Sequence, residues 1–305
     1  MTGAKPVLVV IAGPTASGKT NLAIQVAKVF NTEIISVDSR QVYKEISIGT
    51  AKPSESELSA VKHHFINSNS IFQELNAGLY EQQALGILEK LFIKKNIAIA
   101  VGGTGLYIKA LTKGLDHLPS VSKECRNELN LKYLQDGLDP LRQQLKQLDP
   151  EYYEKIDLNN AQRIIRALEI CLTTGLPYSQ FRKNSVLDRP FDTLLLCLNL
   201  PREELYLRIN QRVDRMMNDG LLEEARTWYN FKEIRSLQTI GYSEMFDYLD
   251  GKYSLALAVE KIKQHTRNFA KRQLTWFRNQ DQFEWLPSTE LEPIINMINQ
   301  KLAGR

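Results

Sequence analysis

Four short apolar runs along the chain predict the strands of a parallel sheet. They lie at residues 7–12, 33–37, 97–101 and 193–200. Continuous apolar runs of this length are typical of strands that are buried on both faces. Helical periodicity separates the first three, and this alternation predicts an α/β fold with a parallel sheet core.

The chain changes character between the third and fourth runs, where helical patterns broken by glycine and proline fill the sequence. Asn159 or Asn160 can cap one of these helices, which Gly175 would end. The economical interpretation is a helical domain inserted between strands of one core. The predicted boundaries are 1–118 and 192–305 for the core and 119–191 for the insertion.

Composition excludes several classes of protein. The 305 residues are 43% hydrophobic and 24% charged, which is ordinary for a folded domain, and no apolar run approaches the roughly 20 residues of a membrane-spanning helix. Cys125, Cys171 and Cys197 are far apart and form no paired motif, which argues against a disulfide framework or a zinc site and suits a reducing compartment. We expect Cys171 and Cys197 to be buried structural residues, and the protein to be cytoplasmic.

Charge is unevenly distributed, although the net charge is only +4. The segment 261–278 contains six Lys or Arg residues and no acid, with aromatic residues between them. Such a segment needs a polyanionic partner or a well-hydrated surface. Trp276 and Phe277 within it are expected to pack in the core.

The strongest chemical signal is a phosphate-binding loop of the form G-x-x-x-x-G-K-[ST] directly after the first run. It consists of Gly13, Pro14, Thr15, Ala16, Ser17, Gly18, Lys19 and Thr20. Backbone N–H groups of such a loop surround a phosphate, the lysine adds positive charge, and Thr20 can bind Mg²⁺. The loop is the ATP-binding motif of many nucleotide enzymes, but it holds other diphosphates equally well.

Two further loops follow apolar runs. Asp38 ends the second run, where it can bind a metal-coordinated water, act as a general base, or cap a turn. Residues 102–105, Gly-Gly-Thr-Gly, end the third run, where glycines indicate close approach of a ligand or of other backbone. The spacing alone does not choose among these alternatives.

Several ordered blocks together make the chain similar to the bacterial tRNA dimethylallyltransferase family. They are the phosphate loop 13–20, Val37–Tyr43, Gly49–Pro53, Val101–Tyr107, Gln162–Glu169, and Ile240–Tyr242 with Thr266–Phe277. The resemblance implies a P-loop core with an inserted helical domain that contacts tRNA. It also implies transfer of a dimethylallyl group from dimethylallyl diphosphate to N6 of adenosine-37, in the anticodon stem-loop of tRNAs that read codons beginning with U.

The resemblance assigns roles to individual residues. Asp38 matches the general base, Thr104 a residue near the accepting amine, and Arg212 a group that binds the diphosphate together with the loop, Thr20 and Mg²⁺. The target base is expected to leave its stack and enter a protein channel. The residues matching tRNA contacts are Asp38, Ser39, Arg40, Gln41, Thr104, Arg126, Gln162, Arg163, Ile164, Ile165 and Arg166.

One departure from the family pattern and two rival functions stay open. Many relatives carry aspartate where this chain has Ser47, and we expect only a local change there. The rivals are a P-loop kinase or ATPase with Asp38 on the metal, and a non-catalytic RNA-binding module that senses nucleotide. A monomer without a redox cofactor is expected.

Overall fold

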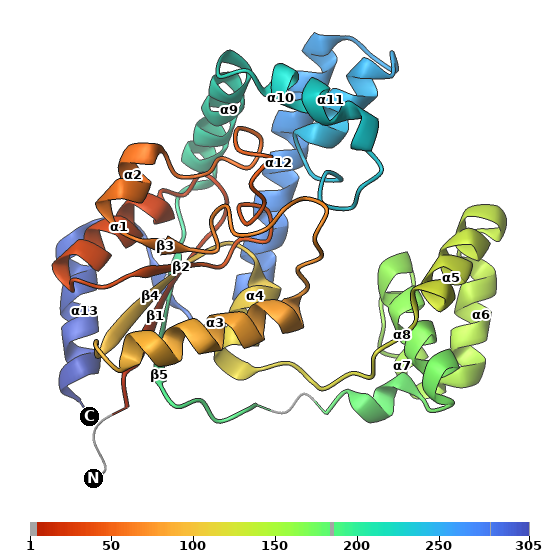
Figure 1. Ribbon diagram of the computed structural model, residues 1–305, viewed down its shortest axis with the longest axis horizontal. Helices are drawn as coiled ribbons and strands as arrows, with labels where there is room; N and C mark the ends of the chain where they lie inside the picture. Colours follow the sequence, from red (N-terminus) through yellow and green to blue (C-terminus); the bar gives the residue numbers. More distant parts are fainter. Residues whose placement is uncertain (1–4, 184–185, 281, 305) are drawn as a thin grey trace. The chain divides into compact units, whose positions relative to one another are not determined.

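A sheet of six parallel strands forms the centre of the computed structural model, which describes residues 5–183, 186–280 and 282–304 (Figure 1). The order across the sheet is β3-β2-β4-β1-β5-β6. The strands are β1 Val7–Ala12, β2 Ile34–Ser36, β3 His63–His64, β4 Ile97–Gly102, β5 Asp192–Leu198 and β6 Glu284–Leu286. The predicted α/β class is confirmed. The edge strands β3 and β6 were not predicted, because two or three residues carry too little periodicity to detect.

Side chains on β1 alternate between two apolar cores. Val7, Val9 and Ile11 pack with α1 (Lys19–Val29) and α13 (Leu291–Ala303). The intervening residues pack on the opposite face with α3 (Ala77–Phe92), α4 (Gly105–Lys113) and the helices that follow β5. Figure 1 shows α1 and α13 on one side of the sheet and α3 on the other. Burial on both faces is the physical reason that β1 is apolar at every position.

The chain after β5 is helical before it returns to β6. Its helices are α9 Arg202–Asn218, α10 Leu221–Trp228, η2 Tyr229–Phe231, α11 Tyr242–Leu249 and α12 Leu255–Arg278, and the short α2 Glu55–Ala60 lies earlier in the chain. The long helix α12 packs on α9 and α11. Phe277 is fully buried and Trp276 packs against the same core, as predicted for both.

The contacts divide the chain into two units, residues 1–112 with 188–305 and the segment Lys113–Leu187. The second unit contains α5 Lys123–Asp136, α6 Asp139–Leu148, α7 Pro150–Tyr153, α8 Ala161–Thr174 and η1 Tyr178–Phe181. Asn160 caps α8 and Gly175, with φ 70°, ends it. Both predicted boundaries shift by a few residues: 113–118, assigned to the core by sequence, belong to the helical unit, and 188–191, assigned to the insertion, belong to the core, where Phe191 is buried.

None of the helices in the described ranges combines the length and the apolar character that crossing a bilayer requires. Cys171 and Cys197 are buried free thiols, as predicted. Burial raises the pKa of Cys197 to about 12, so this thiol stays protonated and is a poor nucleophile.

Candidate active site

Three loops meet at the carboxyl edge of neighbouring strands. The phosphate loop follows β1, Asp38 follows β2, and Gly103–Gly105 follows β4, which lies between β1 and β2 in the sheet. This edge of an open parallel sheet is where ligands bind in α/β proteins. The sheet order therefore brings together segments that are separated by up to 90 residues of sequence.

The phosphate loop has the backbone of an anion-binding nest. Ala16 and Gly18 have left-handed φ angles of 64° and 89°, and α1 begins at Lys19. Successive N–H groups of such a turn point inwards, and the helix N-terminus adds partial positive charge. Ser17 Oγ is buried and has no hydrogen-bond partner within the described residues. An unsatisfied buried hydroxyl inside this loop is a donor in place for a phosphate oxygen.

Three cations from two elements surround the loop. Lys19 Nζ donates to the Pro14 carbonyl at 3.0 Å, and Arg212 Nη1 on α9 donates to Thr15 Oγ1 at 3.3 Å. One turn before Arg212, Arg208 Nη1 lies 3.5 Å from the position of a Cβ at Gly18. The i, i+4 spacing of the two arginines was visible in the sequence, but only the packing of α9 shows that this face meets the phosphate loop.

The electrostatics of the loop favour an anion. The pKa of Lys19 is lowered to about 8, mainly by burial and then by the nearby charge of Arg212, while Asp38 opposes the shift. Burial also lowers the pKa of Arg212. Charged groups held in a desolvated, mutually repelling arrangement are stabilised when an anion binds between them.

Asp38 uses one carboxylate oxygen for the local fold. Its Oδ1 accepts hydrogen bonds from the N–H groups of Arg40 at 2.8 Å and Gln41 at 3.2 Å, which caps the turn after β2. Within the described ranges, Oδ2 accepts no hydrogen bond. The capping interpretation of Asp38 is therefore correct for one oxygen, and the other oxygen is available for chemistry.

Thr104 joins the loop after β4 to the Asp38 segment. Its Oγ1 accepts a hydrogen bond from the Ser39 N–H at 3.0 Å, and its own N–H donates to the Val37 carbonyl at 3.1 Å. These bonds fix the residues on either side of Asp38. The structure thus places Thr104 next to the Asp38 segment, and its role near the accepting amine stays a prediction.

The glycines around Thr104 allow helix α12 to approach the loop. A Cβ at Gly103 would lie 2.2 Å from Gln273 Nε2, and one at Gly105 would lie 2.4 Å from the Trp276 ring. Gln273 is a functional candidate that the sequence analysis did not identify. Its Oε1 accepts from the Thr15 N–H and its Nε2 donates to the Gly103 carbonyl, both at 2.9 Å.

Arg40 and Gln41 bind backbone carbonyls of their own chain. Arg40 Nη1 donates to the carbonyls of Arg235 and Ser236, and Gln41 Nε2 donates to those of Thr50 and Ala51. Both side chains therefore connect neighbouring loops of the core unit. Their contact with tRNA stays a prediction.

Ser47 belongs to a loop that the half-buried acid Glu224 organises. Glu224 on α10 accepts hydrogen bonds from the N–H groups of Ser47, Ile48 and Gly49, at 2.8 to 3.2 Å. Ser47 Oγ accepts one from Lys52 Nζ at 3.2 Å. An aspartate at position 47 would face the same lysine, and the expected local effect of the serine stays a prediction.

The predicted tRNA-contact residues of the helical unit fall into two groups. Gln162 and Arg163 are exposed near the start of α8. Arg126 and Arg166 both bind the buried carboxylate of Glu169; burial alone would raise the pKa of this acid, but the two guanidinium groups lower it. About a third of each arginine side chain stays exposed.

Two of the predicted tRNA contacts need correction. Ile164 is fully buried and Ile165 is 7% exposed, and both pack in the core of the helical unit. Their side chains stabilise this unit and are not available at its surface. The error arose because the family block was carried over as a continuous run, whereas the helical period alternates buried and exposed positions.

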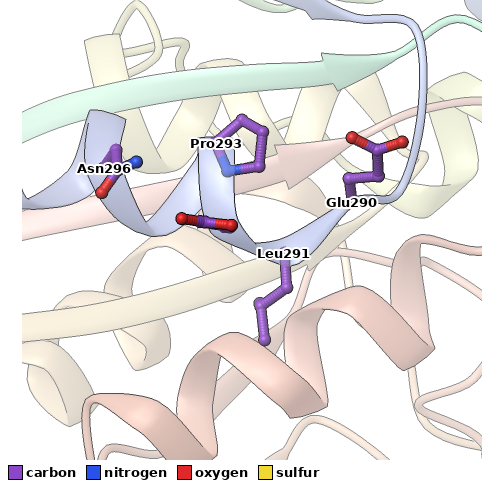
Figure 2. Close-up of a pocket in the computed structure, with 5 residues that line it drawn as sticks. Glu290, Leu291, Pro293 and Asn296 are labelled. Carbon is purple, nitrogen blue, oxygen red and sulfur yellow. The ribbon is translucent and has the colours of Figure 1, made fainter.

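A cavity of about 510 Å³ lies at the start of α13 and is a poor candidate for the same chemistry. Figure 2 shows Glu290, Pro293 and Asn296 along this helix, with Leu291 directed towards α1. The lining contains the carboxylates of Glu290 and Glu292 and no cation, so it would repel a phosphate.

The phosphate loop suits a magnesium ion that is bound mostly by phosphate oxygens and water. It does not suit a metal that is held by protein ligands alone. No group of three His, Cys, Asp or Glu residues within the described ranges could hold a metal. Mg²⁺ usually takes one or two protein oxygens and completes its shell with phosphate oxygens and water. Thr20, in the first turn of α1, carries the hydroxyl that could supply such a protein oxygen.

A glycine-rich loop with a lysine, placed between β1 and α1 of a parallel sheet, defines a P-loop protein. Residues 41–280 match the family model described as IPP transferase. This chain belongs to the IPP transferase family.

Two relatives named tRNA dimethylallyltransferase align with this chain over nearly its full length. The tRNA dimethylallyltransferases of Christiangramia forsetii and Flavobacterium johnsoniae are 50% and 47% identical, covering 97% of this chain and 98% of each relative. A crystal structure described as a eukaryotic dimethylallyltransferase acting on tRNA superposes with a TM-score of 0.81 at 29% identity. It covers 98% of this chain and 80% of the other.

Proposed function

We propose that this protein is a tRNA dimethylallyltransferase. It transfers the dimethylallyl group of dimethylallyl diphosphate to N6 of adenosine-37 in tRNAs that read codons beginning with U, and releases diphosphate. The observation that carries the proposal is the convergence of an anion cradle and an available carboxylate oxygen at adjacent strand ends, in a chain of the IPP transferase family.

The phosphate loop binds the diphosphate of the donor in this proposal. Loop amides, the Ser17 hydroxyl and the charges of Lys19 and Arg212 neutralise the leaving group as negative charge develops on it. ATP is not needed for this chemistry, because the donor already carries its own leaving group.

Asp38 serves as the general base. The adenine N6 is a weak nucleophile because its lone pair is delocalised into the ring, and removal of its proton during attack helps. The N6–C1 bond forms as the C1–oxygen bond to diphosphate breaks, and the N6 proton passes to Asp38 Oδ2. Thr104 holds the Asp38 segment in place through the Ser39 N–H.

Mg²⁺ fits the oxygen donors at the loop, with Thr20 as the protein ligand. When bound, it would neutralise charge on the diphosphate. The protein residues keep their own roles: Lys19 and Arg212 orient the diphosphate and Ser17 donates to it.

Positive charge for tRNA is available on each unit separately. In the helical unit, Gln162 and Arg163 are exposed, together with a third of Arg126 and Arg166. In the core unit, α12 carries the basic segment 261–278. The target base must leave the base stack of the anticodon loop to reach Asp38, and unpaired bases are commonly recognised in this way.

The free thiols suit a cytoplasmic location.

Incubation of the purified chain with unmodified tRNA and labelled dimethylallyl diphosphate tests the proposal. We expect label in N6-isopentenyladenosine at position 37 after digestion to nucleosides. ATP turnover without prenyl transfer would instead favour a P-loop kinase or ATPase. Tight tRNA binding without modification by any donor would favour a non-catalytic RNA-binding module.

A further inference from the structure

We propose that Gln273 is a positioning residue that fixes the donor cradle relative to the acceptor base. The inference rests on the proposed function, and it concerns a helix that contributes no group to the chemistry itself. One side-chain amide ties the phosphate loop to the loop after β4, and this second loop holds the segment that contains Asp38.

The amide of Gln273 makes two hydrogen bonds with opposite roles. Oε1 accepts from the Thr15 N–H in the phosphate loop, and Nε2 donates to the Gly103 carbonyl, each at 2.9 Å. The residue is only 8% exposed, so water competes weakly for either bond. Among the natural side chains of this length, only glutamine supplies a neutral acceptor and donor together.

The surrounding residues make room for this bridge. A Cβ at Gly103 would lie 2.2 Å from Gln273 Nε2, so a side chain there would displace this amide. Gly105 is restricted in the same way by Trp276, which lies one helical turn after Gln273 on the same face of α12. Two glycines and two residues of α12 therefore form a single close contact.

The bridge continues to the base. Thr104, between the two glycines, accepts from the Ser39 N–H at 3.0 Å, and Ser39 directly follows Asp38. The path from the phosphate loop to the base thus consists of the two bonds of Gln273 and the bond of Thr104. All of these residues lie in the core unit.

Transfer of an allylic carbon requires the attacking nitrogen, the carbon and the leaving oxygen to be aligned. The donor is held by the phosphate loop, whereas the nucleophile is held against Asp38. Displacement of about 1 Å between such groups can cost about 100-fold in rate. Loss of the Gln273 bridge should therefore reduce kcat, while each substrate still finds its own binding groups.

Gln273→Met tests this inference because methionine has a similar length and no hydrogen-bonding amide. We expect kcat to fall by about 10-fold to 100-fold, with little change in the affinities for pyrophosphate and for unmodified tRNA. Gln83→Met is the matched control, because Gln83 is exposed on α3 and makes no contact with the site. Thermal unfolding of both variants measures any loss of stability.

Gln273→Glu adds a readout that a purely structural role would not change. A carboxylate can accept from the Thr15 N–H but cannot donate to Gly103; a protonated carboxyl group can do both. The ratio of kcat for this variant to kcat for wild type should therefore rise as the pH falls from about 7 to about 4, across the ordinary pKa of a glutamate. Taking the ratio at each pH cancels the pH effects that both proteins share.

The outcomes separate the two proposals. An active wild type with an equally active Gln273→Met variant overturns the positioning role and leaves the proposed function intact. The same role is overturned if Gln273→Met loses pyrophosphate and tRNA affinity as strongly as kcat, or if Gln273→Glu has a reduced kcat ratio that is flat with pH. A wild-type chain that is inactive on tRNA and donor overturns the proposed function and the positioning role together.

Discussion

Gln273 Nε2 occupies the space that a side chain at Gly103 would need, and it donates a hydrogen bond to the carbonyl of that same glycine. The two residues are 170 positions apart in the chain. Their contact explains why the loop after β4 is rich in glycine: it accommodates a helix, in addition to lying near the phosphate loop.

Gly103→Ala should destabilise the protein by about 1–3 kcal/mol, because the new methyl group overpacks the contact with Gln273. Adding Gln273→Ala should recover part of this loss, since it removes the obstructing amide. Urea unfolding of the two single variants and the double variant measures the coupling. Gly86→Ala in α3 is the control: apart from its own helical turn, no atom of the described residues lies within 4 Å of its Cβ position, and the substitution should stabilise the helix. Additive effects of the two substitutions would contradict the contact.

Asp38→Asn should lower kcat by about 100-fold to 10,000-fold, because the amide oxygen cannot accept the N6 proton as a base. The amide oxygen can still accept the hydrogen bonds from Arg40 and Gln41, so the turn should stay intact. Single-turnover kinetics with saturating tRNA and donor measures the chemical step.

Asp38→Ala provides the comparison for this assignment. It should show the same loss of kcat and a further loss of about 1 kcal/mol in stability, because the cap is removed. Near-normal turnover by the asparagine variant would refute the role of Asp38 as base.

Affinity for pyrophosphate should fall as the pH rises through about 8, because burial lowers the pKa of Lys19 from 10.5 to about 8. Below that pH the ammonium group is charged and attracts the anion; above it the free protein has lost this charge. The effect on stability has the opposite sign: the unfolded chain holds the proton more tightly between these two values, so this group's contribution to stability rises with pH there.

Isothermal titration of pyrophosphate in buffers of different ionisation enthalpy checks this prediction. Above pH 8, binding should take up a proton, because the bound anion restores the charge of Lys19. Lys19→Arg should bind with less dependence on pH in this range, since a guanidinium group stays charged. Equal pH dependence in both proteins would assign the titration to another group.

Arg163→Ala should weaken tRNA binding and reduce the slope of log affinity against log salt by about one, as expected for loss of one phosphate contact. Arg163 is exposed on α8, so the substitution should leave the helical unit folded. Arg166→Ala is a less direct test, because it removes a partner of the buried Glu169. Lys155→Ala, which removes an exposed ion pair with Glu151, is the control. An unchanged salt slope would remove Arg163 from the interface.

Much of the site was encoded in local sequence. The apolar run before Gly13, the left-handed positions that glycine favours and the lysine at the start of α1 all act within a few residues of one another. Asp38 and Gly103 were likewise found because each directly follows a buried strand. Local steric and hydrogen-bonding rules, which depend on neighbours in the chain, suffice for these features.

Other features depended on packing between distant segments. No local sequence pattern predicts the role of Gln273, the approach of Arg208 to the phosphate loop, or the hydrogen bonds from the loop at Ser47 to Glu224. Each of these depends on which face of a helix packs against which loop. Packing within the helical unit likewise decided that Ile164 and Ile165 are buried. By itself, the sequence determined which residues carry charge, oxygen donors and backbone freedom. The tertiary structure alone decided which of them lie within hydrogen-bonding distance, because such contacts depend on how side chains fill space.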